Sequence, residues 1–397
     1  MRMGVTESMT DEIYWAALHK MWENMQNSGR ILRELLLKTT GEMLWKASAM
    51  TLDQYLPDLP AEYKQVLLAE RRRYDLSKIE AYIHTQHIHM LLYKDSAYPP
   101  LLKEIHQPPA ILYYKGTFMN EPLQIGMVGS RKADRYGMET AERIASEFSL
   151  ANIPVVSGLA KGIDAASHKG AIAHHGGTIA VQGCGIDQVY PKENKKLAEE
   201  ILSHEKGCIL TEFPIGSAPA AWHFPMRNRI ISGLSQGVVI VQAARKSGAY
   251  ITVETALEQG RDVFAVPGEI SNPLSEGPHQ LLKEGAQLIT CADDVLASYG
   301  LKKEQKKRSN KSNNKENNAK QEEQQITLFD TQPSAPDVDL SPEEARILNL
   351  FTAEPLTIEE AAYLSKLPMS DLMSILSMLE LYGLIEPMVG RKYIRIG

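Results

Sequence analysis

The segment from Gln124 to Gly170 constrains the fold of this chain more than any other. Two apolar runs, QIGMVGS and PVVSG, each end at a serine beside a glycine, and a basic residue and a helical pattern follow each. Where a buried parallel strand leads into a helix, the first helical N–H groups lack partners and the dipole is positive. Glycine also lets a phosphate approach the backbone closely. The repeated pattern predicts an anion site, although at a single turn the small residues could equally serve helix packing.

Further apolar runs follow the first two and alternate with helix-length segments. They are TIAVQGCG, GCILTEF, GVVIVQA, DVFAVPG and QLIT. Strands that are apolar on both faces and alternate with helices are typical of a parallel sheet covered on both sides. We therefore predict an α/β protein with a Rossmann-like, doubly wound, mostly parallel sheet. Ligands of such sheets bind outside the carboxyl ends of the strands, where we expect Ser130, Ser157, Gly183, Gly185 and Gly268.

The stretch AWHFPMRNRIISGLS adds a second group of candidate residues. Its proline suits the first turn of a helix, and that turn presents Arg227, Asn228 and Arg229. Because two arginines are costly to bury without an anion, the pattern favours phosphate contacts over a structural ion pair. Trp222 and Phe224 are candidates for stacking on bases, with a place in the core as the alternative.

A third turn, in QAARKSGAYITVETALEQG, repeats the chemistry of the first two with Lys246, Ser247 and Gly248. The chain has no G-x-x-x-x-G-K-[ST] loop of ATPases, and its first turn lacks the G-x-G-x-x-G of dinucleotide sites. The acidic residues of this region have no spacing that marks a metal site or an acid-base pair. We therefore predict phosphate-binding turns with no catalytic residue, metal or cofactor, which suits a polymer backbone better than a single nucleotide.

Charge and composition bear on the partners and the location. Residues 121 to 300 carry 16 Lys and Arg against 20 Asp and Glu, within a chain of formal charge -6. Any site for a polyanion must therefore be a focused pocket. No apolar run approaches the roughly 20 residues of a membrane span, and the start MRMGVTESMTDE lacks the apolar core of a signal peptide. We expect a cytoplasmic protein with no membrane partner.

The chain is predicted to divide into four parts. Apolar residues at spacings of three and four in residues 1 to 85 predict a small helical, SAM-like domain. A proline-marked connection then leads into the central domain, residues 86 to 300. Residues 301 to 338 are predicted to be a disordered linker, because their first 25 positions carry 8 Lys and Arg, 4 Asp and Glu and almost no apolar residue. The linker is either a solvated tether or a weak, salt-sensitive contact to DNA.

Residues 339 to 397 are predicted to form a winged-helix domain of three helices and a hairpin. The third helix, which enters the groove in DNA-binding members, carries Asp371 and Glu380 and no cation. Residues 341 to 397 carry 5 Lys and Arg against 8 Asp and Glu. We therefore expect this domain to contact protein or to pack within an assembly rather than to read duplex sequence. Its basic face is limited to three residues of the wing, Arg391, Lys392 and Arg395.

Several motifs resemble those of the DprA (Smf) family, the DNA-processing proteins of natural transformation. They are VGSR at 128 to 131, SGLAKGIDAASH at 157 to 168, HFPMRNRIISGLS at 223 to 235, KSGAYITVETA at 246 to 256 and VPGE at 266 to 269. The helical N-terminal part and the C-terminal domain agree with the family's arrangement, so the resemblance covers nearly the whole chain. Two positions depart from the family pattern: Ala249 replaces a threonine or serine, and His279 lies where members often carry an asparagine.

The resemblance implies a Rossmann-like domain that binds and protects single-stranded DNA, forms homodimers and loads the RecA recombinase onto incoming strands. It places phosphate contacts in the turns described above. With the glycines and the lysine of the same turns, the predicted binding residues are Gly129, Ser130, Arg131, Ser157, Gly158, Lys161, Gly162, Arg227, Asn228, Lys246, Ser247 and Gly248.

A second class of function stays open. Lysine-decarboxylase-like phosphoribohydrolases use glycine-rich turns on the same kind of sheet, with a PGG-x-GT-x-x-E motif. This chain offers SGAYITVE, with Glu254 in a similar place but without the double glycine. The alternative prediction is therefore a nucleoside-monophosphate phosphoribohydrolase. A third possibility is a purely structural adaptor, which predicts no strand binding.

Overall fold

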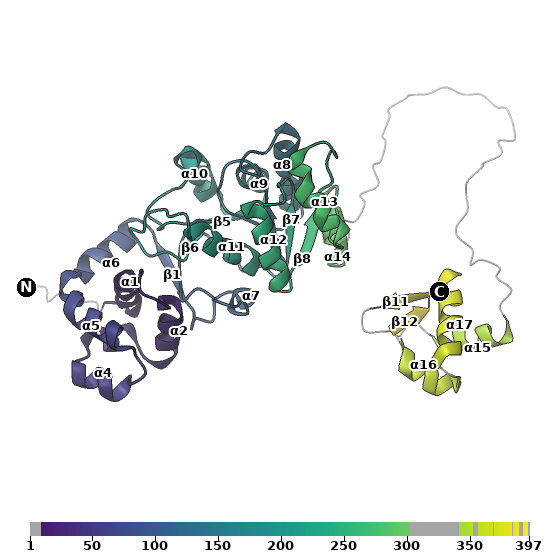
Figure 1. The fold of residues 1–397 in the computed structure, drawn as a ribbon, viewed down its shortest axis with the longest axis horizontal. Coiled ribbons are helices and arrows are strands. Elements are labelled where there is room, and N and C mark those ends of the chain that lie inside the picture. The colour runs from purple at the N-terminus through teal and green to yellow at the C-terminus, as the bar shows by residue number, and fades with distance from the viewer. Residues whose placement is uncertain are drawn as a thin grey trace, which may run out of the picture. The chain divides into compact units, whose positions relative to one another are not determined.

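The computed structural model describes residues 9–301, 341–351, 356–367, 369–382, 384–388 and 392–395. The chain falls into two compact units, Met1–Lys307 and Arg308–Gly397, and Figure 1 shows it coloured by residue number. The predicted linker, residues 301 to 338, lies outside the described residues except for its first position.

A nine-stranded sheet forms the centre of the first unit (Figure 1). Its strands are β1 His89–Leu92, β2 Ile111–Gly116, β3 Ile125–Val128, β4 Val155–Ser157, β5 Thr178–Val181, β6 Gly207–Thr211, β7 Gly237–Ile240, β8 Asp262–Ala265 and β9 Gln287–Leu288. They lie in the order β1-β2-β6-β5-β4-β3-β7-β8-β9. All neighbours from β6 to β9 are parallel, and β1 and β2 add two antiparallel strands at one edge. The predicted doubly wound, mostly parallel sheet is confirmed.

The strand order reverses at β3. Strands β4 to β6 follow β3 outward along one half of the sheet, and β7 then pairs with the other side of β3, with Val128 opposite Ile240. The connections that leave β3 and β7 diverge at this point, which opens a crevice outside the carboxyl ends of the two strands. The fold therefore places the first and third predicted turns next to each other, and Ser130 N donates to Gln242 O at 2.6 Å between them.

Helices cover both faces of the sheet. One face carries α8 Arg135–Leu150, α9 Ile163–Ala171, α10 Lys195–Ser203 and α14 Ala292–Ser298, and the other carries α7 Pro100–Lys103, α11 His223–Gly233, α12 Gly248–Glu258 and α13 Glu276–Lys283. The alternation of side chains along β3 shows why. Met127 packs in one cluster with Phe148 of α8, whereas Val128 packs in another with Ile230 of α11. Burial on both faces accounts for the uninterrupted apolar run of this strand.

The helices that precede the sheet are α1 Asp11–Met21, α2 Ser28–Lys38, α3 Gly41–Lys46, α4 Ala49–Tyr55, α5 Ala61–Glu70 and α6 Leu76–Thr85. Short 3-10 turns occur at Arg71–Arg73, Lys192–Asn194 and Pro273–Ser275. The core of this helical part is continuous with the sheet, since Trp15 and Leu18 of α1 pack in one cluster with Tyr113 of β2 and Ile209 of β6. The helical part and the sheet thus share one compact unit, and the domain boundary at residue 85 stays a prediction.

The second unit contains α15 Pro342–Leu348, α16 Ile358–Ser365 and α17 Met369–Leu381. Its antiparallel sheet has the order β10-β12-β11, with β10 Leu356–Thr357, β11 Ile385–Met388 and β12 Lys392–Arg395. Phe351, Leu372 and Leu376 lie in its buried core. Three helices and a small sheet form the predicted winged helix. Lys392 and Arg395 of the predicted basic face are exposed on β12, whereas Arg391 lies outside the described residues.

None of the described helices is both long and apolar enough to cross a bilayer. In the same residues, no group of three or more His, Cys, Asp or Glu side chains is arranged to hold a metal ion.

Candidate nucleic-acid interface

A trough of about 790 Å³ lies outside the carboxyl end of β3, bordered by the turn after this strand and by the first turns of α11 and α12. Many of the predicted binding residues line it together: Gly129, Ser130, Arg131, Phe224, Arg227, Asn228, Ser247 and Gly248. The lining also includes the base Lys132 and the apolar side chains of Ile231 and Ile251. The trough is the crevice expected where the strand order reverses.

The turn after β3 supplies exposed cations. The Arg131 guanidinium lies 5.2 Å from the centre of the Phe224 ring, an arrangement that orients the cation over an aromatic face. Arg131 and Lys132 are both exposed, and neither forms an ion pair with any residue that the structure describes. Ser130 Oγ accepts from Lys132 N at 3.1 Å, which leaves its own hydrogen available as a donor. This turn can therefore contact an anion without breaking an existing salt bridge.

The third turn adds a helix N-terminus to the trough. Ser247 is the N-cap of α12, and its Oγ accepts from Tyr250 N at 3.4 Å. Gly248 is exposed, and a side chain at this position would meet no atom within 4 Å. Lys246 is exposed and forms no ion pair with the described residues, although it lies just outside the trough lining. Asn228 Nδ2 donates to Gly248 O at 3.4 Å and joins α11 to α12.

Arg227 is held in the interior of the protein. Only 3% of the residue is exposed, and Nη1 donates to the carbonyl oxygens of Gly158 and Val181 at the ends of β4 and β5. Nε donates to Asn228 Oδ1 at 3.1 Å. Burial lowers the pKa of Arg227 to about 10, and the nearby Asp164 carboxylate opposes this shift. Arg227 therefore forms part of the floor of the trough with its Nη1 bound to protein carbonyls, and a phosphate contact at this residue stays a prediction.

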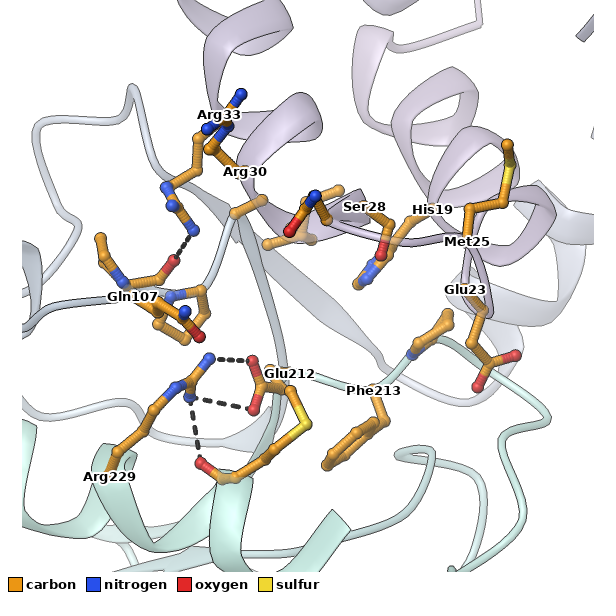
Figure 2. Close-up of a pocket in the computed structure, with 18 of the residues that line it drawn as sticks. His19, Glu23, Met25, Ser28, Arg30, Arg33, Gln107, Glu212, Phe213 and Arg229 are labelled. Carbon is orange, nitrogen blue, oxygen red and sulfur yellow. Dashed lines mark hydrogen bonds and ion pairs between the residues drawn. The ribbon is translucent and has the colours of Figure 1, made fainter. Parts of the chain in front are cut away.

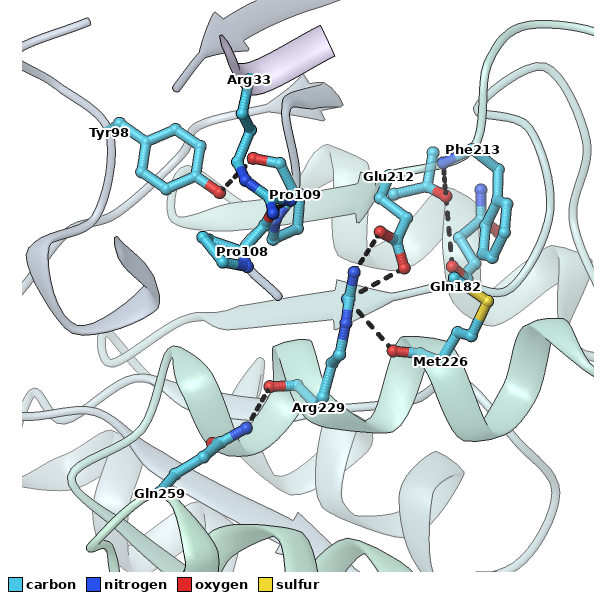
Figure 3. Close-up of polar contacts among 11 residues, drawn as sticks. Arg33, Tyr98, Pro108, Pro109, Gln182, Glu212, Phe213, Met226, Arg229 and Gln259 are labelled. Carbon is cyan, nitrogen blue, oxygen red and sulfur yellow. Dashed lines mark hydrogen bonds and ion pairs between the residues drawn. The ribbon is translucent and has the colours of Figure 1, made fainter. Parts of the chain in front are cut away.

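Arg229 forms a structural ion pair, so the prediction that favoured a phosphate contact there is wrong. Its Nη1 and Nη2 donate to the two carboxylate oxygens of Glu212 at 3.0 Å and 2.6 Å (Figure 3). Both side chains are mostly buried, with 16% and 11% of their area exposed. A paired, bidentate geometry of this kind satisfies both charges internally.

The second predicted turn lines the trough through Ala160 and Asp164, whereas its two predicted donors, Ser157 and Lys161, do not line it. Ser157 is fully buried, and its hydroxyl donates to Met127 O at 2.7 Å. Lys161 forms an exposed ion pair with Glu193 at 2.6 Å. Neither residue belongs to the trough lining, so in this structure their donors bind other groups of the protein.

The glycines of the second turn are explained by close approach. Gly162 has a φ of +76°, and a side chain there would run into the backbone of Ser130. A side chain at Gly158 would run into Arg227 and Asp164. Both positions therefore require glycine for packing, and the second turn positions the first.

The two stacking candidates lie in different places. Phe224 lines the trough, with Tyr190 5.4 Å from it between ring centres. Trp222 is 52% exposed and lines a separate cavity of about 610 Å³ that borders α2. Figure 2 shows this cavity, with Arg33, Glu212 and Phe213 among its labelled lining residues. We call this second space the α2 cavity. It is bounded by residues 23–33, 106–111, 212–214 and by one side of α11.

His168 is a functional support that the sequence pattern did not single out. It is fully buried; its Nε2 accepts from Leu159 N at 3.2 Å, and its Nδ1 lies 2.8 Å from Thr178 Oγ1. Thr178 in turn donates to Val155 O at 2.7 Å, so the network assigns the ring proton to Nδ1. Leu159 has a φ of +56°, which is rare for a branched residue. The histidine that ends SGLAKGIDAASH thus holds the start of the second turn, where Leu159 has its positive φ.

Acidification should destabilise the protein through this histidine. Burial lowers the pKa of His168 to about 3, below its ordinary value of 6.5. As the pH falls below about 6.5 the unfolded chain therefore binds a proton that the folded protein does not bind. The free energy of unfolding should fall by up to ~1.4 kcal/mol per pH unit for this residue until about pH 3. Urea unfolding of wild type and His168→Gln at several pH values should show that the free energy of unfolding depends less steeply on pH in the variant. An equal pH dependence in the two proteins would contradict the assignment.

The fold and the trough define a class of protein: a doubly wound α/β protein with a trough that carries exposed cations at its switch point, preceded by helices and followed by a winged helix. Family models match residues 89–300 to DNA recombination-mediator protein A and residues 331–391 to the DprA winged helix domain. The chain belongs to the DprA (Smf) family of DNA-processing proteins, as its motifs indicated.

Individual relatives agree with this assignment. The chain is 39% identical over 278 residues to the DNA processing protein DprA of Bacillus subtilis, covering 69% of this chain and 87% of that protein. It is 31% identical over 405 residues to the protein Smf of Synechocystis, covering 97% and 99% of the two chains. The X-ray structure of DprA from Streptococcus pneumoniae superposes with a TM-score of 0.60 at 37% identity, covering 72% of this chain and 97% of that chain.

Of the two positions that depart from the family pattern, one lines the trough and the other does not. Ala249 lines the trough where a hydroxyl would add a donor. His279 Nε2 lies 3.1 Å from Gly268 O and 3.3 Å from Gly268 N, so it holds the loop after β8. Glu254, the candidate acid of the hydrolase alternative, is exposed on α12 and does not line the trough.

Proposed function

We propose that the protein is a non-catalytic DNA-processing factor whose trough binds single-stranded DNA through its phosphates. The observation that carries this proposal is the set of exposed bases at the switch point, Arg131, Lys132 and Lys246, which have no ion-pair partner among the described residues. Arg131 lies over the Phe224 ring, and Lys246 directly precedes the N-cap of α12; cations with an aromatic ring and a helix N-terminus are the combination expected for unpaired nucleic acid. Family membership supports the DNA-processing role.

A binding role fits the trough better than chemistry does. Asp164 is the one carboxylate among the lining residues; it is 7% exposed and lies beside Arg227. Burial raises the pKa of Asp164, and Arg227 opposes that shift. A buried carboxylate beside a fixed guanidinium serves the interior of the protein rather than a general acid or base. If the hydrolase alternative holds, incubation with nucleoside monophosphates should release free base, and we expect none.

Binding should be selective for single strands. A fluorescent oligothymidine titrated with the full chain is expected to bind more tightly than a duplex of equal length, and the preference should persist at two salt concentrations. The log-log salt slope should be near -0.7 per phosphate contacted. A chain ending at residue 307, which retains the whole first unit, should keep most of this binding. Equal affinity for duplex, or loss of binding on removing residues 308 to 397, would contradict the placement of the site.

The proposal extends to two protein partners that the family implies, a second copy of this chain and the RecA recombinase. Family membership is its support. We further propose that the winged helix contacts protein, because α17 carries acidic residues and no cation. Sedimentation of the full chain, and displacement of a coat protein from DNA by RecA with and without this chain, test the two partners separately.

A further inference from the structure

Helix α11 separates the trough from the α2 cavity. Phe224 and Asn228 of this helix line the trough, whereas Trp222, Met226 and Arg229 line the α2 cavity. Positions 222, 226 and 229 fall on one side of a helix by their spacing. A helix with its side chains is about 10–12 Å wide, so a DNA strand that leaves the trough meets the α2 cavity after crossing a single helix.

The charges of the α2 cavity leave one guanidinium without a counter-ion. The carboxylates in its wall are already neutralised, since Glu212 pairs with Arg229 and Glu23 pairs with Lys20 at 2.7 Å. Arg33 is half-buried and forms no ion pair in the described parts of the chain. Its one recorded hydrogen bond there runs from Nη1 to Pro108 O at 2.5 Å (Figures 2 and 3).

This arrangement favours an anionic ligand. Arginine has five N–H donors, and a partly desolvated cation without a counter-ion is costly. The pKa of Arg33 is lowered by burial, in line with that cost. The first turn of α2, which borders the same cavity, carries no acidic side chain. A phosphate oxygen near Arg33 would supply the missing negative charge.

An aromatic surface lies in the same cavity. The Trp222 ring is held edge-on by His223 and Phe213, with ring centres 4.1 Å and 6.2 Å away. His223 is itself fixed, because it stacks on Phe213 at 3.9 Å and its Nδ1 lies 3.0 Å from Gly183 O. A fixed and half-exposed indole offers a flat surface on which any base can stack.

We propose that the α2 cavity is a second subsite for single-stranded DNA, in which Arg33 contacts a phosphate and Trp222 stacks on a base. The inference rests on the proposed function of the trough, and it extends the strand path across α11 onto the helical N-terminal part. A strand that occupies both sites must be longer than one that fills the trough alone. The two sites can therefore be separated by the length of the oligonucleotide.

Tryptophan fluorescence reports this site selectively. Of the four tryptophans in the chain, Trp15, Trp22 and Trp45 are at most 9% exposed, whereas Trp222 is 52% exposed. An oligothymidine of about 12 nucleotides, within the range of known single-strand sites, should quench the emission of the full-length protein. One of about 4 nucleotides should bind the trough and leave the emission nearly unchanged. Trp222→Phe should abolish the quenching by the longer strand.

Affinity measurements test Arg33 in parallel. Arg33→Gln should weaken binding of the longer strand by roughly tenfold and make its log-log salt slope shallower by about 0.7. The shorter strand should bind as in wild type, which also shows that the variant is folded. Arg33→Lys should recover part of the affinity. The matched control is Arg73→Gln, which removes an exposed arginine paired with Glu70 at 2.6 Å and should leave both strands unaffected.

The outcomes distinguish this inference from the proposed function. If Arg131→Ala weakens the binding of both strands, Arg33→Gln weakens the binding of neither, and no quenching occurs, the second subsite is wrong and the function proposed for the trough is retained. If Arg131→Ala leaves both strands unaffected, the function proposed for the trough is wrong. Equal losses for the two strands in Arg33→Gln would also overturn the second subsite, because they would indicate a general effect on the fold.

Discussion

Replacing Arg131 by alanine should weaken the binding of single-stranded DNA by roughly tenfold, and by a similar factor for every base sequence. The guanidinium is exposed, lies over Phe224 and forms no ion pair with the described residues, so its donors are available to a phosphate. A charge-assisted hydrogen bond contributes ~1.5–3 kcal/mol, and a phosphate contact carries no sequence information. The log-log salt slope should also become shallower by about 0.7. Fluorescence anisotropy with homopolymer and mixed strands at several salt concentrations measures both quantities.

Two further variants test whether the loss of affinity is specific to cations that have no ion-pair partner among the described residues. Lys246→Ala removes the exposed base of the third turn and should act in the same direction. Arg135→Ala removes a cation close in sequence to the first turn, at the start of α8, that pairs with Glu139 at 2.6 Å, and it should change the affinity little. An unchanged affinity and slope in both Arg131→Ala and Lys246→Ala would show that the strand binds elsewhere.

Replacing Arg227 by leucine should lower the free energy of unfolding by about 3–5 kcal/mol, the range found when one partner of a buried charge pair is removed. The substitution leaves the carbonyls of Gly158 and Val181 without this donor, and it leaves the buried Asp164 without the nearby positive charge. Denaturant unfolding of the full chain, read by a probe of the first unit, measures the loss. By contrast, Arg131→Ala is a surface change and should stay within about 0.5 kcal/mol of wild type.

A double-mutant cycle that combines Arg227→Leu with Asp164→Asn tests whether Arg227 acts as a buried structural clamp rather than as a phosphate contact. If the arginine acts as a buried clamp, the losses should be non-additive by about 0.5–3 kcal/mol, because removing the carboxylate charge relieves part of the cost of losing the arginine. A stable Arg227→Leu variant that loses DNA binding would instead restore the predicted phosphate contact at this position.

The layered architecture followed from the sequence because it depends on local pattern. Apolar runs such as QIGMVGS are buried on both faces, and the helices between them carry their apolar residues on the faces that cover the sheet. The crevice at the carboxyl ends of β3 and β7 then follows from connectivity alone. The sequence pattern predicted that Ser130 and Ser157 lie at one edge of the sheet, whereas the pairing of β3 with β7, which brings the turn at Ser247 next to the turn at Ser130, is seen only in the structure.

The roles of the individual arginines did not follow from the sequence. Arg227 and Arg229 are two positions apart on α11. Arg227 donates to a carbonyl just after β4 and to one at the end of β5, whereas Arg229 pairs with Glu212 after β6. The carbonyl of Gly158 is 69 positions away along the chain. No periodicity reveals such partners, because the register of distant elements sets them.

Stacking residues show the same limit. Trp222 and Phe224 are neighbours in the sequence, but they line different cavities because α11 turns about 100° per residue. Both serines close an apolar run of the sequence, but Ser130 lies two residues beyond β3, whereas Ser157 is the last residue of β4 and its hydroxyl donates to Met127 O inside the sheet.

The sequence by itself determined the family and the doubly wound sheet, and it predicts the edge at which a polyanion would bind, because these depend on apolar periodicity and on short motifs. Only the tertiary structure decided which cations are free. A charged side chain is available to a ligand when no distant carboxylate neutralises it and some of its donors reach solvent. Among the described residues, Arg131 and Arg33 have no carboxylate partner, although one donor of Arg33 binds Pro108 O. By contrast, Arg227 is buried against two carbonyls, and Arg229 pairs with Glu212.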